Sequence, residues 1–118
     1  MEIYTFNKNS GIKISKFDSN FILSRILQTD QSTHIGCMHL EKNGIVGYHQ
    51  AKVSQLLLII NGEGYVRGDQ EEYVKVQPDD AVFWEKDEWH ETKTDHGMTA
   101  LVIEAPKLNP SQFMEFKA

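Results

Sequence analysis

The chain has 118 residues, 40% hydrophobic and 25% charged, which is the composition of an ordinary globular protein of one domain. Its formal net charge of -5 argues against nucleic acid and anionic membrane surfaces as partners, because phosphate binding needs clustered lysine and arginine side chains. The longest apolar run, Leu56 to Ile60, is too short to cross a bilayer.

Strand-like runs and turn signals alternate along the chain. Polar segments such as Asn43-Gly44 and Gly62-Glu63-Gly64 interrupt the apolar runs at intervals of roughly 8–12 residues. The expected strands are, in chain order, residues 21–27, 33–40, 48–61, 65–67, 73–76, 81–84, 89–93 and 99–104. Many short strands with regular turns predict an all-β sandwich or barrel, and only the tail at 110–116 is expected to form a helical turn.

Cys37 is the only cysteine, so the chain can form no disulfide within itself. This fits a reducing compartment, and we expect a cytoplasmic location. We expect the Cys37 side chain to be buried among apolar neighbours, as free cysteines commonly are.

The longest expected strand, 48–61, carries two polar side chains on an otherwise apolar face. Alternate side chains of a strand share a face, so His49, Ala51 and Gln55 should point the same way as Leu57 and Ile59. We expect that face to line the interior of the protein. An unpaired polar group there costs on the order of 1–3 kcal/mol, so His49 and Gln55 need partners.

A second set of alternating positions follows the short apolar strand at 81–84. Trp84, Glu88, His90 and Thr92 fall on one face if the turn between them preserves the alternation. Trp84 is expected to be core or pocket wall, because aromatic side chains supply much of a pocket's apolar surface. Glu88 and Glu91 flank His90 closely enough to raise its pKa.

The spacing of the first set resembles the first motif of the cupin superfamily. That motif has a Gly, five residues, His-x-His, three or four residues, Glu, six residues and Gly. Here His49, Ala51, Gln55 and Gly62 fall at the two His positions, the Glu position and the final Gly, and Asn43 falls at the opening Gly. The resemblance covers roughly residues 33–104.

The second cupin motif follows in the right order. It usually reads Pro-Gly-Asp, an apolar strand, Pro-x-Gly, two residues and His. Pro78-Asp79-Asp80, residues 81–84, Glu85-Lys86-Asp87 and His90 stand at those places. The other three histidines hold no motif position and are expected to be surface or strand residues; they are His34, His39 and His96.

The resemblance implies a double-stranded β-helix, or jelly-roll barrel, and a site that in typical members holds one divalent metal through three histidines and one glutamate. His49 and His90 match two of the histidines, whereas Ala51 and Gln55 stand where the family has a third histidine and the glutamate. The metal ligands implied here are His49, His90 and Gln55. The pocket is expected to be lined by Glu88, Trp84, Ala51 and Thr92, and Glu88 is the best candidate for a further carboxylate.

Three interpretations of His49 stay open. As a metal ligand with His90, it needs a third donor such as the Gln55 oxygen, Glu88 or water, and Zn, Ni, Mn or Fe suits such a set. As half of a polar pair with Gln55, it orients a small ligand without metal. As a structural residue, it is a core histidine whose hydrogen bonds are satisfied within the protein.

We expect a single cupin-like domain over residues 1–118, with a core barrel at about 33–104, an N-terminal strand at 20–28 and a short C-terminal tail at 105–118. A homodimer is expected, in which the apolar strand around 21–27 is an edge to be covered. The expected function is binding of a small polar molecule in the barrel, with a divalent metal held by His49 and His90 as one form of the site. The alternatives are a metal-dependent oxygenase or isomerase of a small polar metabolite, and a non-catalytic, degenerate cupin.

Overall fold

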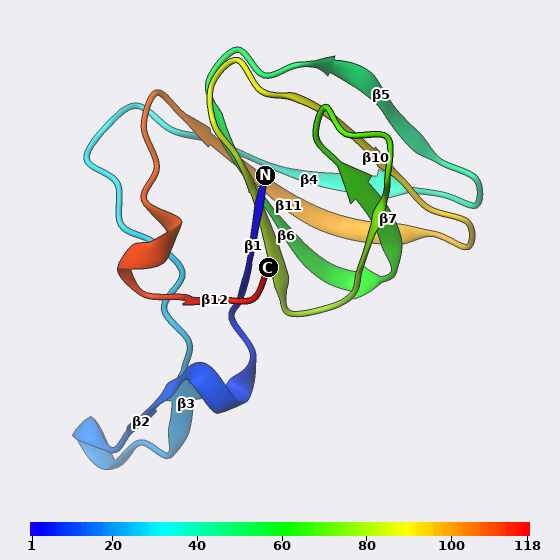
Figure 1. Ribbon diagram of the computed structural model, residues 1–118. Helices are drawn as coiled ribbons and strands as arrows, with labels where there is room; N and C mark the ends of the chain where they lie inside the picture. The colour runs from blue at the N-terminus through cyan, green and yellow to red at the C-terminus, as the bar shows by residue number, and fades with distance from the viewer.

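The strands form two facing antiparallel sheets and a separate two-stranded ribbon (Figure 1). The computed structural model describes all residues, 1–118. The strands are β1 (Glu2–Thr5), β2 (Ile12–Ile14), β3 (Phe21–Leu23), β4 (His34–Leu40), β5 (Ile45–Gln50), β6 (Ser54–Gly62), β7 (Gly64–Arg67), β8 (Val74–Val76), β9 (Asp80–Trp84), β10 (Trp89–Lys93), β11 (Met98–Ala105) and β12 (Glu115–Phe116). Three short 3-10 helices, η1 (Lys8–Ser10), η2 (Lys16–Asp18) and η3 (Pro110–Gln112), complete the chain. None of these helices has the length or the apolar character needed to span a membrane.

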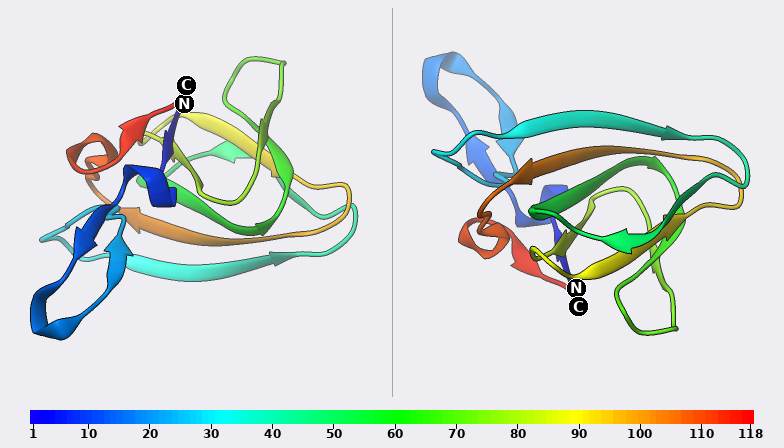
Figure 2. Two further views of the ribbon diagram at one scale, coloured as in Figure 1. Left: turned by 90° about the horizontal axis from the view of Figure 1, so that it is seen from below. Right: turned by 90° about the horizontal axis from the view of Figure 1, so that it is seen from above.

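The larger sheet has the strand order β12-β1-β9-β6-β11-β4, and the smaller sheet has the order β5-β10-β7-β8. Figure 2 shows the long strands β4 and β11 curving along one side of the molecule. The all-β jelly-roll fold expected from the sequence is confirmed. The two sheets do not close into a barrel, because no ladder joins the edge strands of one sheet to those of the other.

The expected strand at 48–61 is two strands in different sheets. β5 lies at the edge of the smaller sheet and β6 lies inside the larger one. The chain crosses between them at Ala51, whose N–H donates to the Glu88 carbonyl at 2.9 Å and whose carbonyl accepts from the Asp87 N–H at 2.8 Å. The prediction of one continuous face from residue 49 to residue 59 is therefore wrong, because this turn fixes a corner that the alternation of polar and apolar residues does not reveal.

Strand β6 is buried on both faces, which explains its unbroken run of leucine and isoleucine. Leu57 and Ile59 belong to the core between the two sheets, together with Trp84. Leu56 and Leu58 belong to a second core on the outer face of the larger sheet. Full burial of such a side chain contributes about 1.5–3 kcal/mol, so β6 stabilises both cores.

The ends of the chain complete the larger sheet, beyond the core expected at 33–104. β1 pairs with both β9 and β12, and the Ile3 N–H donates to the Ala118 carbonyl at 2.6 Å. The tail holds the helical turn η3, which is shorter than the segment expected at 110–116. The expected N-terminal strand ends early, since β3 stops at Leu23 and residues 24–33 carry no strand.

Candidate functional site

The structure brings His49 and His90 together. β5 and β10 are antiparallel neighbours in which His49 pairs directly with His90. The centroids of the two imidazole rings are 4.4 Å apart, and the ring planes cross at 55°. The convergence of these two residues follows from the ladder, because directly opposed residues point to the same face of a sheet.

A β-bulge in β5 sets the direction of the neighbouring side chains. His90 pairs with His49 but Thr92 pairs with Val46, so Gly47 and Tyr48 together lie opposite Glu91. The extra residue keeps both His49 and Val46 on the inner face of the smaller sheet. Tyr48 turns to the outer face, where its ring stacks on that of Trp89 with centroids 5.3 Å apart.

Both histidines direct their Nδ1 atoms to main-chain carbonyls. His49 Nδ1 lies 2.7 Å from the Gly47 oxygen, and His90 Nδ1 lies 3.5 Å from the Glu88 oxygen. A carbonyl only accepts, so the 2.7 Å contact assigns the His49 proton to Nδ1, and the longer His90 contact favours the same tautomer. In this tautomer the Nε2 lone pair of each ring is free. A free Nε2 with an oriented Nδ1–H is the arrangement in which histidine binds a metal or accepts a hydrogen bond from a ligand.

The two histidines differ in exposure. His90 is 1% exposed, whereas His49 lies exposed on the edge strand of the smaller sheet. The expectation that His49 lines the interior of the protein is therefore wrong. Burial of His90, together with its proximity to His49, lowers its pKa and outweighs the carbonyl and charge of Glu88. The expectation that flanking acids raise this pKa is wrong, and His90 is a neutral imidazole at neutral pH.

Trp84 forms the inner wall of the site. Its ring stacks on that of His90 with centroids 4.7 Å apart and planes at 29°. Trp84 Nε1 and His90 Nε2 are both buried without any hydrogen-bond partner in the protein. Each such group costs on the order of 1–3 kcal/mol, and two on one stacked pair of rings mark a place where a polar partner is missing.

Gln55 reaches this region from the larger sheet. It is half-buried, and in the ladder it lies opposite Trp84 on one side and Glu104 on the other. Its place beside Trp84 puts it on the sheet that faces His90, although it does not share a strand with His49. Ala51, at the crossing between the sheets, is 4% exposed.

Glu88 does not present a free carboxylate to the histidines. One carboxylate oxygen of Glu88 lies 2.7 Å from the Met1 α-amino group, and the other accepts from the Glu85 N–H at 3.0 Å. Thr92 is buried between β5 and β7, opposite Val46 and Val66. The structure contains no group of three His, Cys, Asp or Glu side chains that could hold a metal ion.

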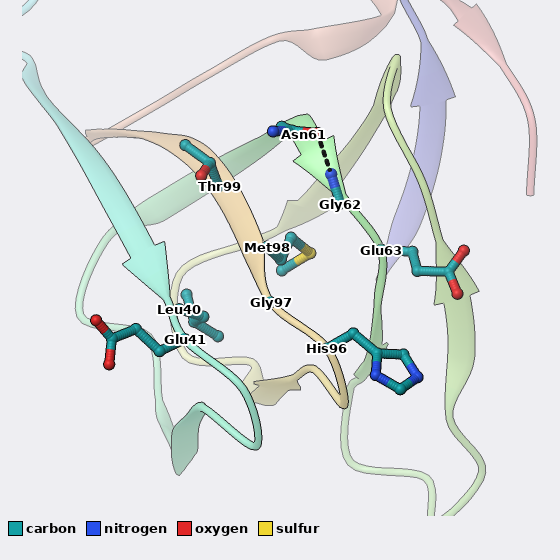
Figure 3. A pocket seen from close by; sticks show the side chains of 9 residues that line it. All are labelled: Leu40, Glu41, Asn61, Gly62, Glu63, His96, Gly97, Met98 and Thr99. Carbon is teal, nitrogen blue, oxygen red and sulfur yellow. Dashed lines mark hydrogen bonds between the residues drawn. The ribbon is translucent and has the colours of Figure 1, made fainter.

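One hollow lies beside the turn that follows β10, at the end of that strand away from His90. It has a volume of about 720 Å³ and is lined by Leu40, Glu41, Asn61, Gly62, Glu63, His96, Gly97, Met98 and Thr99. Figure 3 shows that the side chains of Glu41, Glu63 and His96 point in different directions, so they form no convergent site. Neither this hollow nor four others of about 510, 500, 400 and 330 Å³ is lined by His49, Gln55 or His90.

Sequence reasoning missed the polar cluster on the outer face of the smaller sheet. Arg67 Nε donates to Glu91 at 3.0 Å, the Tyr73 hydroxyl donates to the same carboxylate, and the Arg67 guanidinium lies 4.2 Å from the centroid of the Tyr48 ring. The hydrogen bonds from Tyr73 and Arg67 lower the pKa of Glu91. Glu91 therefore belongs to a structural network and not to the His90 site. The sequence signal for this outer role was strand alternation, which places Glu91 on the opposite face from its inward-facing neighbour His90.

The other histidines and the cysteine lie away from the site. His34 and His39 are exposed on β4 and His96 is exposed in a turn, as expected of surface or strand residues. Cys37 is exposed on β4, so the expectation that it is buried is wrong. β4 is an edge strand, and no second layer covers its outer side at this point.

Comparison with known proteins shows likeness in structure alone. No family model and no curated protein sequence matches the chain. A cupin superfamily protein from Desulfitobacterium hafniense matches with a TM-score of 0.60 at 19% identity, over 68% of this chain and 72% of that one. An RmlC-like cupin from Shewanella frigidimarina matches with a TM-score of 0.60 at 17% identity, over 70% and 74%.

A third similar structure is that of a predicted oxalate decarboxylase from Thermotoga maritima. Its TM-score is 0.54 at 21% identity, over 58% of this chain and 62% of that one. At this level of identity the likeness concerns architecture and not activity. The facing sheets, the paired histidines and these neighbours lead to one conclusion: the chain has the cupin fold.

Proposed function

We propose that the chain binds a small polar molecule at the His90–Trp84 pair, with His49 at the entrance. The observation that carries this proposal is the pair of buried, unpartnered atoms, Trp84 Nε1 and His90 Nε2. The indole N–H can only donate, and the His90 Nε2 accepts when the proton is on Nδ1. A ligand hydroxyl or primary amide both accepts and donates, so it matches the two atoms.

Access to His90 lies on the side of His49. His49 is exposed, its ring is against that of His90, and it stands on an edge strand that pairs only with β10. A ligand that reaches the buried His90 ring from this side therefore requires the His49 side chain to move. Gln55, beside Trp84, is placed to give the ligand a further hydrogen bond from its amide.

A divalent metal is the second form of this site. His49 and His90 would hold Zn, Ni, Mn or Fe through Nε2, with the Gln55 oxygen as a neutral third ligand, and the metal would supply Lewis acidity to a bound molecule. The free Nε2 atoms fit this role. The site lacks a third histidine or a carboxylate ligand, so the bound molecule must fill most of the coordination positions of the metal. The oxygenase or isomerase activity implied by the family resemblance depends on such a metal.

A screen of thermal stability against polar metabolites tests the proposal. A bound ligand raises stability by RT ln(1 + [L]/Kd), so a compound at about 100 times its Kd adds about 2.7 kcal/mol. We expect at least one neutral hydroxyl or amide compound to stabilise the natural protein and His96→Ala, but not His90→Ala. Stabilisation that survives His90→Ala would place the ligand elsewhere.

Titration calorimetry with each metal alone separates the two forms. Binding that is lost in both His49→Ala and His90→Ala, and kept in His96→Ala, supports the metal form. Equal loss in all three variants would show that the ligands are misassigned.

The exposed, unpaired Cys37 supports the proposal that the protein works in a reducing compartment such as the cytoplasm.

A further inference from the structure

The orientation of His49 over the buried ring of His90 depends on the short segment 47–49 of β5. The two imidazole centroids are 4.4 Å apart, and His49 Nδ1 lies 2.7 Å from the Gly47 oxygen. This hydrogen bond spans the residue between them, so the backbone of Tyr48 sets the distance from donor to acceptor. Because β5 is an edge strand, only β10 pairs with this segment (Figure 1).

The main chain holds the bulge of β5 only weakly. Gly47 and Tyr48 lie together opposite Glu91, and a bulge interrupts the regular ladder. A Cβ added at Gly47 would meet no other part of the chain within 4 Å, so packing at that residue does not fix the bulge. The hydrogen bond of an exposed histidine to a nearby carbonyl also competes with water. A lasting orientation of His49 therefore requires a further contact on this segment.

Tyr48 supplies that contact on the outer face of the smaller sheet. Its ring stacks on that of Trp89 with centroids 5.3 Å apart and planes at 27°. The guanidinium carbon of Arg67 lies 4.2 Å from the centroid of the same tyrosine ring. We call Tyr48, Trp89 and Arg67 the outer clamp. Ring stacking and cation–π attraction both depend on direction, so β10 and β7 together fix one side chain of β5.

Arg67 is itself held in place and gives the outer clamp a firm support. Its Nε donates to Glu91 at 3.0 Å, and its Nη1 donates to the Gln70 carbonyl at 3.1 Å. The Tyr73 hydroxyl donates to the same Glu91 carboxylate. The side chains of Arg67 and Glu91 are both largely buried, so water weakens this ion pair less than one on the open surface.

We propose that Tyr48 is a positioning residue for the ligand site. Its contacts with Trp89 and Arg67 fix the bulge of β5. The fixed bulge holds the His49 ring over that of His90. The inference rests on the proposed function, because access to His90 matters only if a ligand binds there. The outer face of the smaller sheet thus governs the entrance to the site without touching the ligand.

Loss of the outer clamp should change both histidines. Without the Tyr48 ring, the bulge gains freedom, and His49 exchanges its hydrogen bond with Gly47 for water. The Nδ1–H tautomer of His49 then mixes with the Nε2–H tautomer. When the His49 ring turns away, His90 becomes accessible to a reagent in solution.

Acylation by diethyl pyrocarbonate, which attacks neutral imidazole, measures access to His90. Trypsin releases His90 on a peptide that contains no other histidine, so mass spectrometry gives its rate alone. Tyr48→Leu should raise this rate about tenfold, because a ring stack and a cation–π contact are both lost. Tyr48→Phe keeps an aromatic ring against Trp89 and Arg67 and should stay within about twofold of the natural rate.

Tyr65→Leu is the matched control. Tyr65 is a tyrosine of the same outer face, but it lies on β7 and its ladder partners belong to β10 and β8, not to β5. Global unfolding exposes His90 in every variant, and urea denaturation of each variant measures that contribution. The rate at exposed His96 corrects for reagent concentration. We expect Tyr65→Leu to leave the His90 rate at its natural value.

The tautomer of His49 gives a readout that a general loss of stability does not move. Long-range ¹H–¹⁵N NMR spectra should show only the Nδ1–H form in the natural protein and in Tyr65→Leu, and a mixture in Tyr48→Leu. Mixed tautomers in the natural protein would overturn the proposal. A His90 rate that Tyr48→Leu leaves unchanged, or that Tyr65→Leu raises equally, would overturn it as well. Neither measurement needs a ligand, so a ligand screen without a hit would count against the proposed function alone.

Discussion

Replacement of His90 by leucine tests whether its Nε2 is truly without a partner. Leucine has nearly the volume of histidine and removes the buried acceptor, whose desolvation costs on the order of 1–3 kcal/mol. The stacking on Trp84 is lost as well, and such ring pairs contribute about 0.5–1.5 kcal/mol. The Nδ1 contact at 3.5 Å is long and adds little. The gain exceeds the loss, so His90→Leu should be about 1 kcal/mol more stable than the natural protein without ligand.

Urea denaturation at pH 7.5, with the slope of the transition compared between the two proteins, measures this difference. For a domain of this size, about 1 kcal/mol corresponds to an increase in Tm of roughly 3–6 °C. The same variant should lose all stabilisation by ligand. If His90 is instead a satisfied structural histidine, His90→Leu should cost at least 1 kcal/mol, and that result would refute the reasoning about the site.

Three further predictions concern charge. The pKa of His90 is lower in the folded than in the unfolded protein, so the stability linked to neutral His90 is fully present above about pH 6.5. Below that pH the free energy of unfolding should fall by up to about 1.4 kcal/mol per pH unit. His90→Leu should flatten this part of the pH profile. Glu91→Gln removes a charged acceptor from Arg67 and should cost about 1–3 kcal/mol in urea denaturation, whereas no loss would show that the outer network is not structural. Ala51→His with Gln55→Glu rebuilds the family's ligand set and should bind divalent metals more tightly in calorimetry; a folded double variant with no gain would exclude a metal site formed by residues 49, 51, 55 and 90.

The fold was predictable because most strands are short runs of alternating apolar and polar residues that end at clear turn signals. The central run of β6 was also recognisable, since burial on both faces produces continuous leucine and isoleucine. The corner at Ala51 was not predictable, because it depends on two main-chain hydrogen bonds to the distant turn at 87–88. Likewise β1 and β12 join the larger sheet through ladders between the two ends of the chain, and short segments carry no sequence signal for such a pairing.

The pairing of His49 with His90 followed from the spacing of two motifs, because both positions lie near the ends of neighbouring strands. Alternation alone misjudged the exposure of His49, since β5 is the edge strand of the smaller sheet and pairs only with β10. It also assigned Glu88 to the site by parity. The Glu88 carboxylate turns back to the main chain at Glu85, which is a local hydrogen bond that parity does not describe.

The substitutions at the family's ligand positions remove charged and polar groups from the site. Gln55 is neutral where a glutamate stands in typical members, Ala51 carries no polar atom, and burial keeps His90 neutral. The charge of the Glu88 carboxylate is already paired with the Met1 α-amino group, and its other oxygen accepts from the Glu85 N–H. A charged ligand would therefore enter this space without a fixed counter-charge and pay for its desolvation, whereas a neutral hydroxyl or amide satisfies Trp84 Nε1 and His90 Nε2 without that cost. The residues that weaken a metal site are thus the same ones that favour a neutral polar ligand.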